Sequence, residues 1–316
     1  MREYILRRLL LTIPVLLGVS IGIFSLIRIV PGDTLMAMID QSGSVTPEDL
    51  AKIRSQMGLD KPFLTQYVTW MSGVVRGDLG ASYWTGKPVT DELIQRLPVT
   101  MQLAVMAIVI SIGIAVPVGI LSAIRQDSFL DYSSRLFVVG GLSFPDFWIG
   151  TLVVVFPSVW WHYGAPLGVA SFAENPVKNL LQFGPPALIL GIRFAATTMR
   201  MTRSQMLEVL RQDYIRTAWA KGLKERAIVY RHALKNALIP VITIMGTQFR
   251  VLVGGTVIME ILFSLPGLGT FIVEGIRLRD YPRVQGGVMY IAVLVVFINL
   301  AVDVMYAWFD PRIRYK

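Results

Sequence analysis

The chain of 316 residues contains no cysteine and only two histidines. Without cysteine, disulfide bonds and thiolate metal sites are excluded. The histidines, His162 and His232, stand far apart in the sequence and neither belongs to a cluster of potential ligands, so no resident metal is expected. No pairing of a nucleophile with a general base stands out either. The sequence therefore predicts neither a catalytic nor a metal-binding role for this chain.

A nucleotide-binding loop is also missing. The nearest match runs from Gly80 to Pro88, but it has five residues between its glycines, and Pro88 stands where a serine or threonine is required. Any ATP hydrolysis linked to this chain is therefore expected on another subunit.

Charged residues are scarce, at 16%, while 54% of residues are hydrophobic and the mean hydropathy is +0.58. Soluble domains contain about one quarter charged residues, so this composition places the chain in a lipid bilayer. The net charge of +9 could suggest nucleic acid. Most basic residues flank apolar runs, however, and that placement is typical of membrane topology. Nucleic acid is not an expected partner.

Six apolar runs have the ~20 residues needed to cross ~30 Å of hydrocarbon. They cover residues 9–30, 99–124, 136–161, 184–206, 237–261 and 284–308. The short alternation of barrel strands is lacking, so we expect an all-α membrane protein of six transmembrane helices. The first run follows three arginines and superficially resembles a signal peptide. It is too long for one and no small-residue cleavage site follows, so we expect it to be retained.

The positive-inside rule sets the expected orientation. With the N-terminus inside, the cytoplasmic side receives most of the flanking basic residues, including Arg125, Arg135 and the C-terminal group from Arg312 to Lys316. The opposite side receives a smaller basic set: Lys178, Arg277, Arg279 and Arg283. Both termini are therefore predicted in the cytoplasm.

Residues 31–98 are long enough for a small helical subdomain on the outer face. A first helix is expected from Thr46-Pro47 to Gly58, because a capping threonine and a proline mark its start. A second should begin near Pro62 and end at Gly77, with four apolar residues on one face: Phe63, Tyr67, Trp70 and Met71. Two short helices cannot bury a core alone, so we expect them to lie on the membrane domain.

The basic loop at residues 213–240 suggests a docking surface for another protein. It is predicted to form helices over 213–221 and 225–238, joined at Gly222, where a left-handed turn costs least. Its basic residues are Arg216, Lys221, Lys224, Arg226, Arg231 and Lys235, against two acidic ones. A basic charge alone is equally typical of any cytoplasmic loop. Only the order of the residues can therefore distinguish a docking loop from an ordinary one.

That order resembles the cytoplasmic coupling loop of ABC importer permeases of the dipeptide, oligopeptide and nickel subfamily. The motifs that carry the resemblance extend over nearly the whole chain: Pro31-Gly32-Asp33, Gly77-Asp78-Leu79-Gly80, Arg200-Met-Thr-Arg203, Asp213-Tyr214, Ala220-Lys221-Gly222-Leu223, the stretch from His232 to Pro240, Glu260 to Gly269, Arg279-Asp280-Tyr281-Pro282 and Asp310-Pro311-Arg312. Two positions depart from the pattern. Arg216 stands where the general loop signature has an acidic residue, and Trp219 where a basic one is usual.

The resemblance implies a type I ABC importer permease fold in a bacterial or archaeal cytoplasmic membrane. Its parts would be the N-terminus and first helix (1–30), the outer subdomain (31–98), and a five-helix core (99–316) with the coupling loop at about 207–236. The implied partners are a second permease subunit, two cytosolic ATPases that carry ATP and magnesium, and an extracytoplasmic binding protein that lands on the outer subdomain. No cofactor is implied on this chain. The implied ATPase contacts are Arg216, Ala218, Trp219, Ala220, Lys221, Gly222 and Leu223.

Two arginines, Arg193 and Arg250, interrupt the fourth and fifth apolar runs near their middles. An arginine inside a membrane marks a functional site by default, and in an importer both could line the path and attract a substrate carboxylate. The alternative is pairing with Asp146, Asp303 or a neighbouring subunit. The substrate stays open among peptides, nickel chelates, glutathione and oligosaccharides. An ion-coupled secondary transporter or channel is the alternative function.

Overall fold

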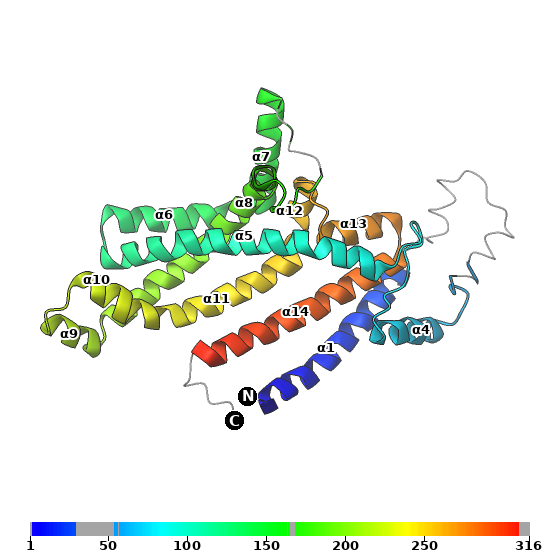
Figure 1. Cartoon of the computed structure of the whole chain (residues 1–316), viewed down its shortest axis with the longest axis horizontal. Helices are drawn as coiled ribbons and strands as arrows, with labels where there is room; N and C mark the ends of the chain where they lie inside the picture. Colours follow the sequence, from blue (N-terminus) through cyan, green and yellow to red (C-terminus); the bar gives the residue numbers. More distant parts are fainter. Residues whose placement is uncertain (1, 30–53, 56, 163, 165–167, 310–316) are drawn as a thin grey trace. The chain divides into compact units, whose positions relative to one another are not determined.

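The computed structural model describes residues 2–29, 54–55, 57–162, 164 and 168–309 (Figure 1). Within these residues the secondary structure is helical, apart from one isolated bridge between Ala81 and Pro88. The helices are α1 (Arg2–Ile29), α4 (Phe63–Val75), α5 (Val89–Ile124), α6 (Phe129–Ser143), α7 (Asp146–Trp161), α8 (Pro176–Leu210), α9 (Asp213–Ala220), α10 (Glu225–Ala227), the π-helix η1 (Ile228–Ala233), α11 (Leu234–Gly255), α12 (Val257–Leu262), α13 (Leu268–Leu278) and α14 (Tyr281–Phe309).

The chain forms two compact units. The first comprises Met1–Thr100 and Pro266–Phe297, and the second comprises Met101–Leu265 and Ile298–Lys316. The long helices α5 and α14 each begin in the first unit and end in the second.

Five helical stretches in the described part of the chain are long and apolar enough to cross a membrane. They are Arg7–Ile29, Val89–Ile124, Pro176–Leu210, Glu225–Gly255 and Tyr281–Val304. A sixth span results if α6 and α7 are counted together. The prediction of an all-helical membrane protein is thus confirmed, with five or six spans according to how this pair is counted.

The third predicted span is not one straight helix. It is divided into α6 and α7, whose axes differ by 86°. Phe144 between them has an extended backbone, with φ −100° and ψ 133°, and Pro145 precedes the first residue of α7. Proline disfavours helical geometry in the residue before it and cannot donate a helical hydrogen bond. The break therefore falls at the one proline near the middle of this run.

The fifth span differs from its prediction at both ends. The expected loop helix over 225–238 exists, but it continues without a break through the π-helix and α11, so that Glu225–Gly255 is one helical stretch. At the other end the helix stops at Gly255 rather than Ile261, and the separate short helix α12 follows. The predicted first loop helix is confirmed as α9.

In the first unit, the short helix α4 packs on α1 through aromatic residues. The Phe24 ring on α1 is fully buried. Ring centroids of Phe63, Tyr67 and Trp70 lie 5.1, 5.2 and 5.6 Å from it. These are members of the predicted apolar face, which is therefore confirmed as a packing surface. The start of the other predicted outer helix, at Thr46-Pro47, lies outside the described residues.

The second unit is built around α8, which packs against α6, α7 and α11. At Gly191 the backbone of α8 comes very close to α5. A Cβ atom there would lie 2.7 Å from Ile110 Cγ2 and 3.0 Å from the Ala107 carbonyl oxygen. Small residues allow this kind of close helix contact in membrane proteins.

Candidate functional site

The predicted coupling loop turns at Gly222, directly after α9. Gly222 has φ +73°, a conformation that side chains with a Cβ rarely adopt. Its amide donates to the Trp219 carbonyl at 2.9 Å, and the Leu223 amide donates to that of Ala218 at 3.3 Å. A Cβ at position 222 would meet nothing within 4 Å. Glycine is thus required here by the backbone, while the space above it is open.

One face of α9 is buried in the second unit. Ile215 and Ala218 are 0% and 6% exposed. They belong to a core (here the loop core) that also contains residues from α5, α8, η1 and α11: Ile120, Ala123, Met206, Ile228, Val229, Ala233 and Ala237. Figure 1 shows α9 and α10 at the end of α8. A displacement of α9 would therefore act on the ends of the three long helices α5, α8 and α11.

The other predicted coupling residues lie on the opposite, solvent-facing side. Trp219 is 49% exposed and Leu223 is 38% exposed. Arg216, Ala220, Lys221 and Gly222 are exposed as well. Six of the seven predicted residues are therefore exposed, whereas Ala218 is buried in the loop core. The exposed residues thus include both large apolar side chains, Trp219 and Leu223, and basic ones.

A π-helix follows the loop and was not expected from the sequence. It places Ile228, Val229 and Ala233 in the loop core, and Asn236 Nδ2 just beyond it donates to Tyr214 Oη at 2.8 Å. The extra residue of a π-helix turn shifts the side chains that follow it, and such turns are often found at functional sites. No local pattern in this stretch distinguishes a π-helix from an α-helix.

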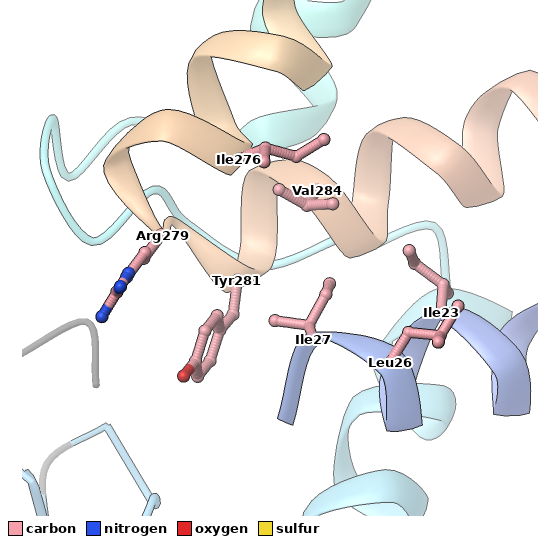
Figure 2. A pocket seen from close by; sticks show the side chains of 7 residues that line it. All are labelled: Ile23, Leu26, Ile27, Ile276, Arg279, Tyr281 and Val284. Atoms are coloured by element: carbon pink, nitrogen blue, oxygen red, sulfur yellow. The ribbon is translucent and has the colours of Figure 1, made fainter. Parts of the chain in front are cut away.

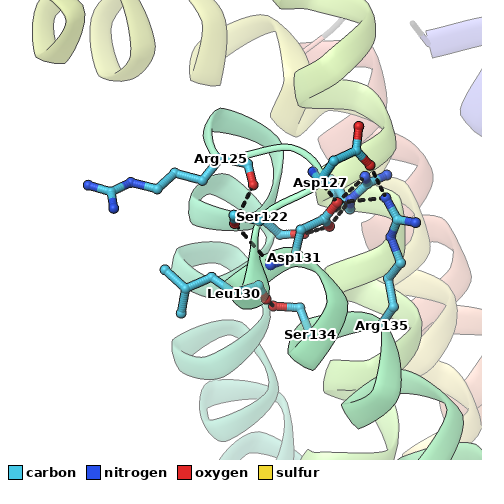
Figure 3. A network of polar contacts seen from close by, with 9 residues as sticks. Ser122, Arg125, Asp127, Leu130, Asp131, Ser134 and Arg135 are labelled. Atoms are coloured by element: carbon cyan, nitrogen blue, oxygen red, sulfur yellow. Dashed lines mark hydrogen bonds and ion pairs between the residues drawn. The ribbon is translucent and has the colours of Figure 1, made fainter.

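A buried carboxylate near the loop core was also missed. Asp131, in the first turn of α6, is 0% exposed and receives hydrogen bonds from Ser122 on α5 and Arg203 on α8. Figure 3 shows Ser122, Asp131 and Arg135 directed toward one another. Arg203 stands in a motif that carries the family resemblance, and that was the one available signal for this cluster.

The intramembrane arginine Arg193 forms an ion pair with Asp146, the first residue of α7. Of the partners considered from the sequence, Asp146 is therefore the one observed. The Arg193 side chain is still 52% exposed, whereas that of Asp146 is 14% exposed. The pair connects the middle of α8 to the break between α6 and α7.

The second intramembrane arginine, Arg250, has a neutral partner. Its Nη1 atom donates to Asn299 Oδ1 at 2.8 Å, which links α11 to α14. This amide partner is neutral, whereas the partner of Arg193 is a carboxylate.

A cavity of about 220 Å³ lies in the first unit, among α1, α13 and α14 (Figure 2). It is lined by Ile23, Leu26, Ile27, Ile276, Arg279, Tyr281 and Val284. Figure 2 shows aliphatic side chains around most of it, with polar atoms only from Arg279 and Tyr281. A peptide backbone would leave most of its hydrogen-bonding groups unsatisfied there, so this cavity is a poor candidate for a peptide site.

The corner between α13 and α14 holds the loop at residues 80–88. Asp280, which is fully buried, accepts hydrogen bonds from Ser82 Oγ at 2.5 Å and from the Tyr83 amide at 3.3 Å. Trp84 Nε1 donates to the Leu278 carbonyl at 2.8 Å. Burial raises the pKa of the Tyr83 hydroxyl to about 12. Within the first unit, this part of the predicted outer subdomain is therefore fixed to the corner between α13 and α14.

The same corner contains a bidentate ion pair. Arg283 Nη2 lies 2.9 and 3.0 Å from the two carboxylate oxygens of Glu92 on α5, and both side chains are largely buried. Among the described residues no group of three or more histidine, aspartate or glutamate side chains is arranged to hold a metal ion.

Two solved structures share this fold. A methionine ABC transporter in an inward-facing conformation matches with a TM-score of 0.55 at 18% identity, over 69% of this chain and 96% of its own. An amino acid ABC transporter with histidines matches with a TM-score of 0.53 at 13% identity, over 71% and 95%. The fold is therefore that of the membrane subunit of a type I ABC importer.

The family follows from the sequence. Residues 115–315 match the family model described as binding-protein-dependent transport system inner membrane component, and residues 1–104 match the model of its N-terminal part. The chain belongs to this family, as a multi-pass permease of the inner membrane. This finding supports the resemblance seen in the motifs and leaves the ion-coupled transporter without support.

Curated relatives match over their full length. The dipeptide transport system permease protein of Escherichia coli K12 is 38% identical over 339 residues, covering 100% of both chains. The protein of the same description from Alkalihalophilus pseudofirmus is 39% identical over 344 residues, again with 100% coverage of both. A probable peptide ABC transporter permease of Sinorhizobium fredii is 40% identical over 315 residues with the same coverage.

Proposed function

We propose that this chain forms half of the translocation path of a di- or oligopeptide importer and that it receives the force of ATP hydrolysis through the exposed face of α9 and Gly222. The observation that carries the proposal is the two-sided structure of α9. Its buried face is fixed in the loop core, while its open face presents Trp219 and Leu223 among basic residues. A helix that is anchored on one side and open on the other suits docking to a partner.

The proposed assembly contains a second, related permease subunit, two cytosolic ATPases and an extracytoplasmic binding protein. ATP and magnesium would be bound by the ATPases, and this chain would be non-catalytic. Both termini and α9 would face the cytoplasm, and the segment at residues 31–98 would meet the binding protein. The names of the curated relatives support peptides as the substrate class. Nickel chelates, glutathione and oligosaccharides are the alternatives within this kind of importer.

We propose that Arg193 contacts the substrate. Its guanidinium is half-exposed although it is paired with Asp146, so its open side could also bind a peptide carboxylate while the pair with Asp146 is kept. Arg250 would act similarly from α11. Peptides with a free C-terminus should therefore stimulate ATP hydrolysis by the complex more than the same peptides with an amidated C-terminus. Equal stimulation would contradict the carboxylate contact.

The docking surface is tested with Gly222→Asp, measured by the ATPase subunits that co-purify with the chain. Aspartate would be strained at φ +73° and would add a negative charge and bulk to the open surface. We expect the chain to insert normally but to lose the ATPases and transport. Gly222→Asn is the matched control for backbone strain, because asparagine has a similar size and adopts this conformation much as aspartate does but adds no charge. If Gly222→Asp retains the ATPases and transports normally, the docking assignment is wrong.

A further inference from the structure

The cluster around Asp131 joins three helices at one point. The Asp131 carboxylate on α6 accepts from Ser122 Oγ on α5 at 2.5 Å, and from Arg203 Nε and Nη2 on α8 at 2.6 and 2.7 Å. Arg203 Nε also lies 3.1 Å from Ser122 Oγ. On its outer side the carboxylate receives Arg135 Nη2 at 2.6 Å, from the same helix. The docking function proposed above does not use this cluster.

Stability alone is a poor explanation for such a cluster. A buried ion pair contributes little net stability, because desolvation offsets the attraction between the charges. A bidentate arginine–carboxylate pair does have a fixed geometry. The apolar contacts between α6 and the neighbouring helices, such as those of Val138 and Met199, lack this directionality. The cluster therefore fixes how far along α8 and α5 the helix α6 is placed.

The cluster also lies next to the loop core. On α5, Ser122 stands between Ile120 and Ala123, two members of that core, and on α8 Arg203 precedes the core residue Met206 by less than one helical turn. Helix α6 contributes no residue to the loop core. Beside the short connection of residues 125–128, its polar link to α5 and α8 therefore joins α6 to helices that pack on the docking helix α9.

At its other end α6 leads to the break at Phe144 and to Asp146, the partner of Arg193. A movement of α6 along its axis would therefore displace this break. Without the link at Asp131, only the connection at residues 125–128 and the apolar contacts would make α6 follow the ends of α5 and α8.

We propose that Asp131 and Arg203 are positioning residues that make α6 move as one body with the docking helix, so that the force of ATP hydrolysis reaches the α6–α7 break. The inference rests on the proposed function, namely that α9 receives that force. The ATPases themselves need not contact Asp131 or Arg203 for this role.

The test uses the full complex, with its ATPases and binding protein, in lipid vesicles and with a labelled dipeptide as the probe. The quantity measured is dipeptide transported per ATP hydrolysed. We expect Asp131→Asn to lower this ratio roughly 2- to 30-fold, the range seen for residues that carry coupling between sites. The ATPases should still co-purify. An assembled variant with an unchanged ratio would overturn the proposal.

Arg135→Gln is the matched control. Arg135 binds the same carboxylate, but from α6 itself and with a side chain that is 45% exposed. It cannot fix α6 against another helix, so the ratio should stay at the wild-type value. A loss as large as that of Asp131→Asn would overturn the proposal, because it would show that the compensation of the Asp131 charge, and not the link to α8, is what matters.

The double variant Asp131→Asn/Arg203→Gln separates positioning from folding. It removes both charges, so neither buried charge is left without its partner. We expect assembly close to that of the wild type, with the loss of coupling retained. Recovery of the wild-type ratio, or failure of both the single and the double variant to assemble, would assign the cluster to folding alone and overturn the proposal.

A spin-label distance provides a readout that needs no substrate. The chain has no cysteine, so single cysteines can be introduced at Leu136 on α6, 72% exposed, and at Asp213 on α9, whose side chain is 95% exposed. In the wild-type complex this distance should be the same with and without ATP. In Asp131→Asn the distribution of distances should broaden, or its mean should change, when ATP is added. A wild-type distance that changes with ATP would overturn the proposal. Absence of the ATPases from the wild-type complex would instead refute the proposed function.

Discussion

Replacing Gly191 with alanine should destabilise the second unit by overpacking. The added Cβ would lie 2.7 Å from Ile110 Cγ2 and 2.8 Å from Ile110 Cβ, whereas carbon atoms in contact prefer about 3.5–4.0 Å. Relief needs α8 and α5 to separate by roughly 1 Å, because the β-branched Ile110 is stiff and the Ala107 carbonyl is part of the backbone. Overpacking of this kind costs about 1–3 kcal/mol.

The measurement is the thermal unfolding midpoint of the purified chain in detergent. A cost of that size lowers the midpoint by several degrees, at roughly 2–4 °C per kcal/mol for a folded unit of this size. Gly113→Ala on α5 is the control, because its Cβ would meet nothing within 4 Å and alanine favours a helix more than glycine. An unfolding midpoint for Gly191→Ala equal to or above that of Gly113→Ala would refute the close contact between α5 and α8.

Two further predictions concern the corner of the first unit. Arg283→Lys should lower the free energy of unfolding by about 1–3 kcal/mol, because lysine cannot make the bidentate contact with Glu92. Arg283→Ala should lower it further, because it leaves a buried carboxylate unpaired. Equal losses for the two variants would contradict the bidentate geometry. Tyr83 ionises at about pH 12 in the folded chain but near pH 10 when unfolded, so its contribution to stability is present below about pH 10 and lost as the pH rises toward about 12. In Tyr83→Phe, stability measured over that range should fall less steeply, and an identical slope would speak against burial of the hydroxyl.

Local patterns predicted much of the fold. The apolar face of α4 was visible because its residues recur with the helical period, and the position of Gly222 followed from its place between two helical patterns. The number of spans followed from hydropathy. A hydropathy profile says nothing about the directions of helix axes, however, so it could not show that the axes of α6 and α7 differ by 86°. Pro145 lies at the break, but Pro157 lies within the unbroken α7, so a proline in the sequence gives neither the place nor the angle of a bend.

The site was predicted less completely because its contacts join residues far apart in the sequence. The spacing of Ile215 and Ala218, three residues apart, could have shown that Ala218 belongs to the buried face of α9. Asp131 gave no such signal, since its main partner Arg203 is on another helix. The choice of Asp146 over Asp303 as the partner of Arg193 likewise depends on the bend between α6 and α7.

The lengths of α5 and α8 have a consequence for the thickness of membrane that this permease fits. They contain 36 and 35 residues, and at 1.5 Å per residue they are about 54 and about 53 Å long, against ~30 Å of hydrocarbon. Absorbing that difference by tilt alone would need an angle beyond the usual limit of about 40°. Part of each helix therefore extends past the lipid tails into the headgroups and water. Bilayers of different thickness can therefore surround these helices, because part of their length lies outside the hydrocarbon in each case.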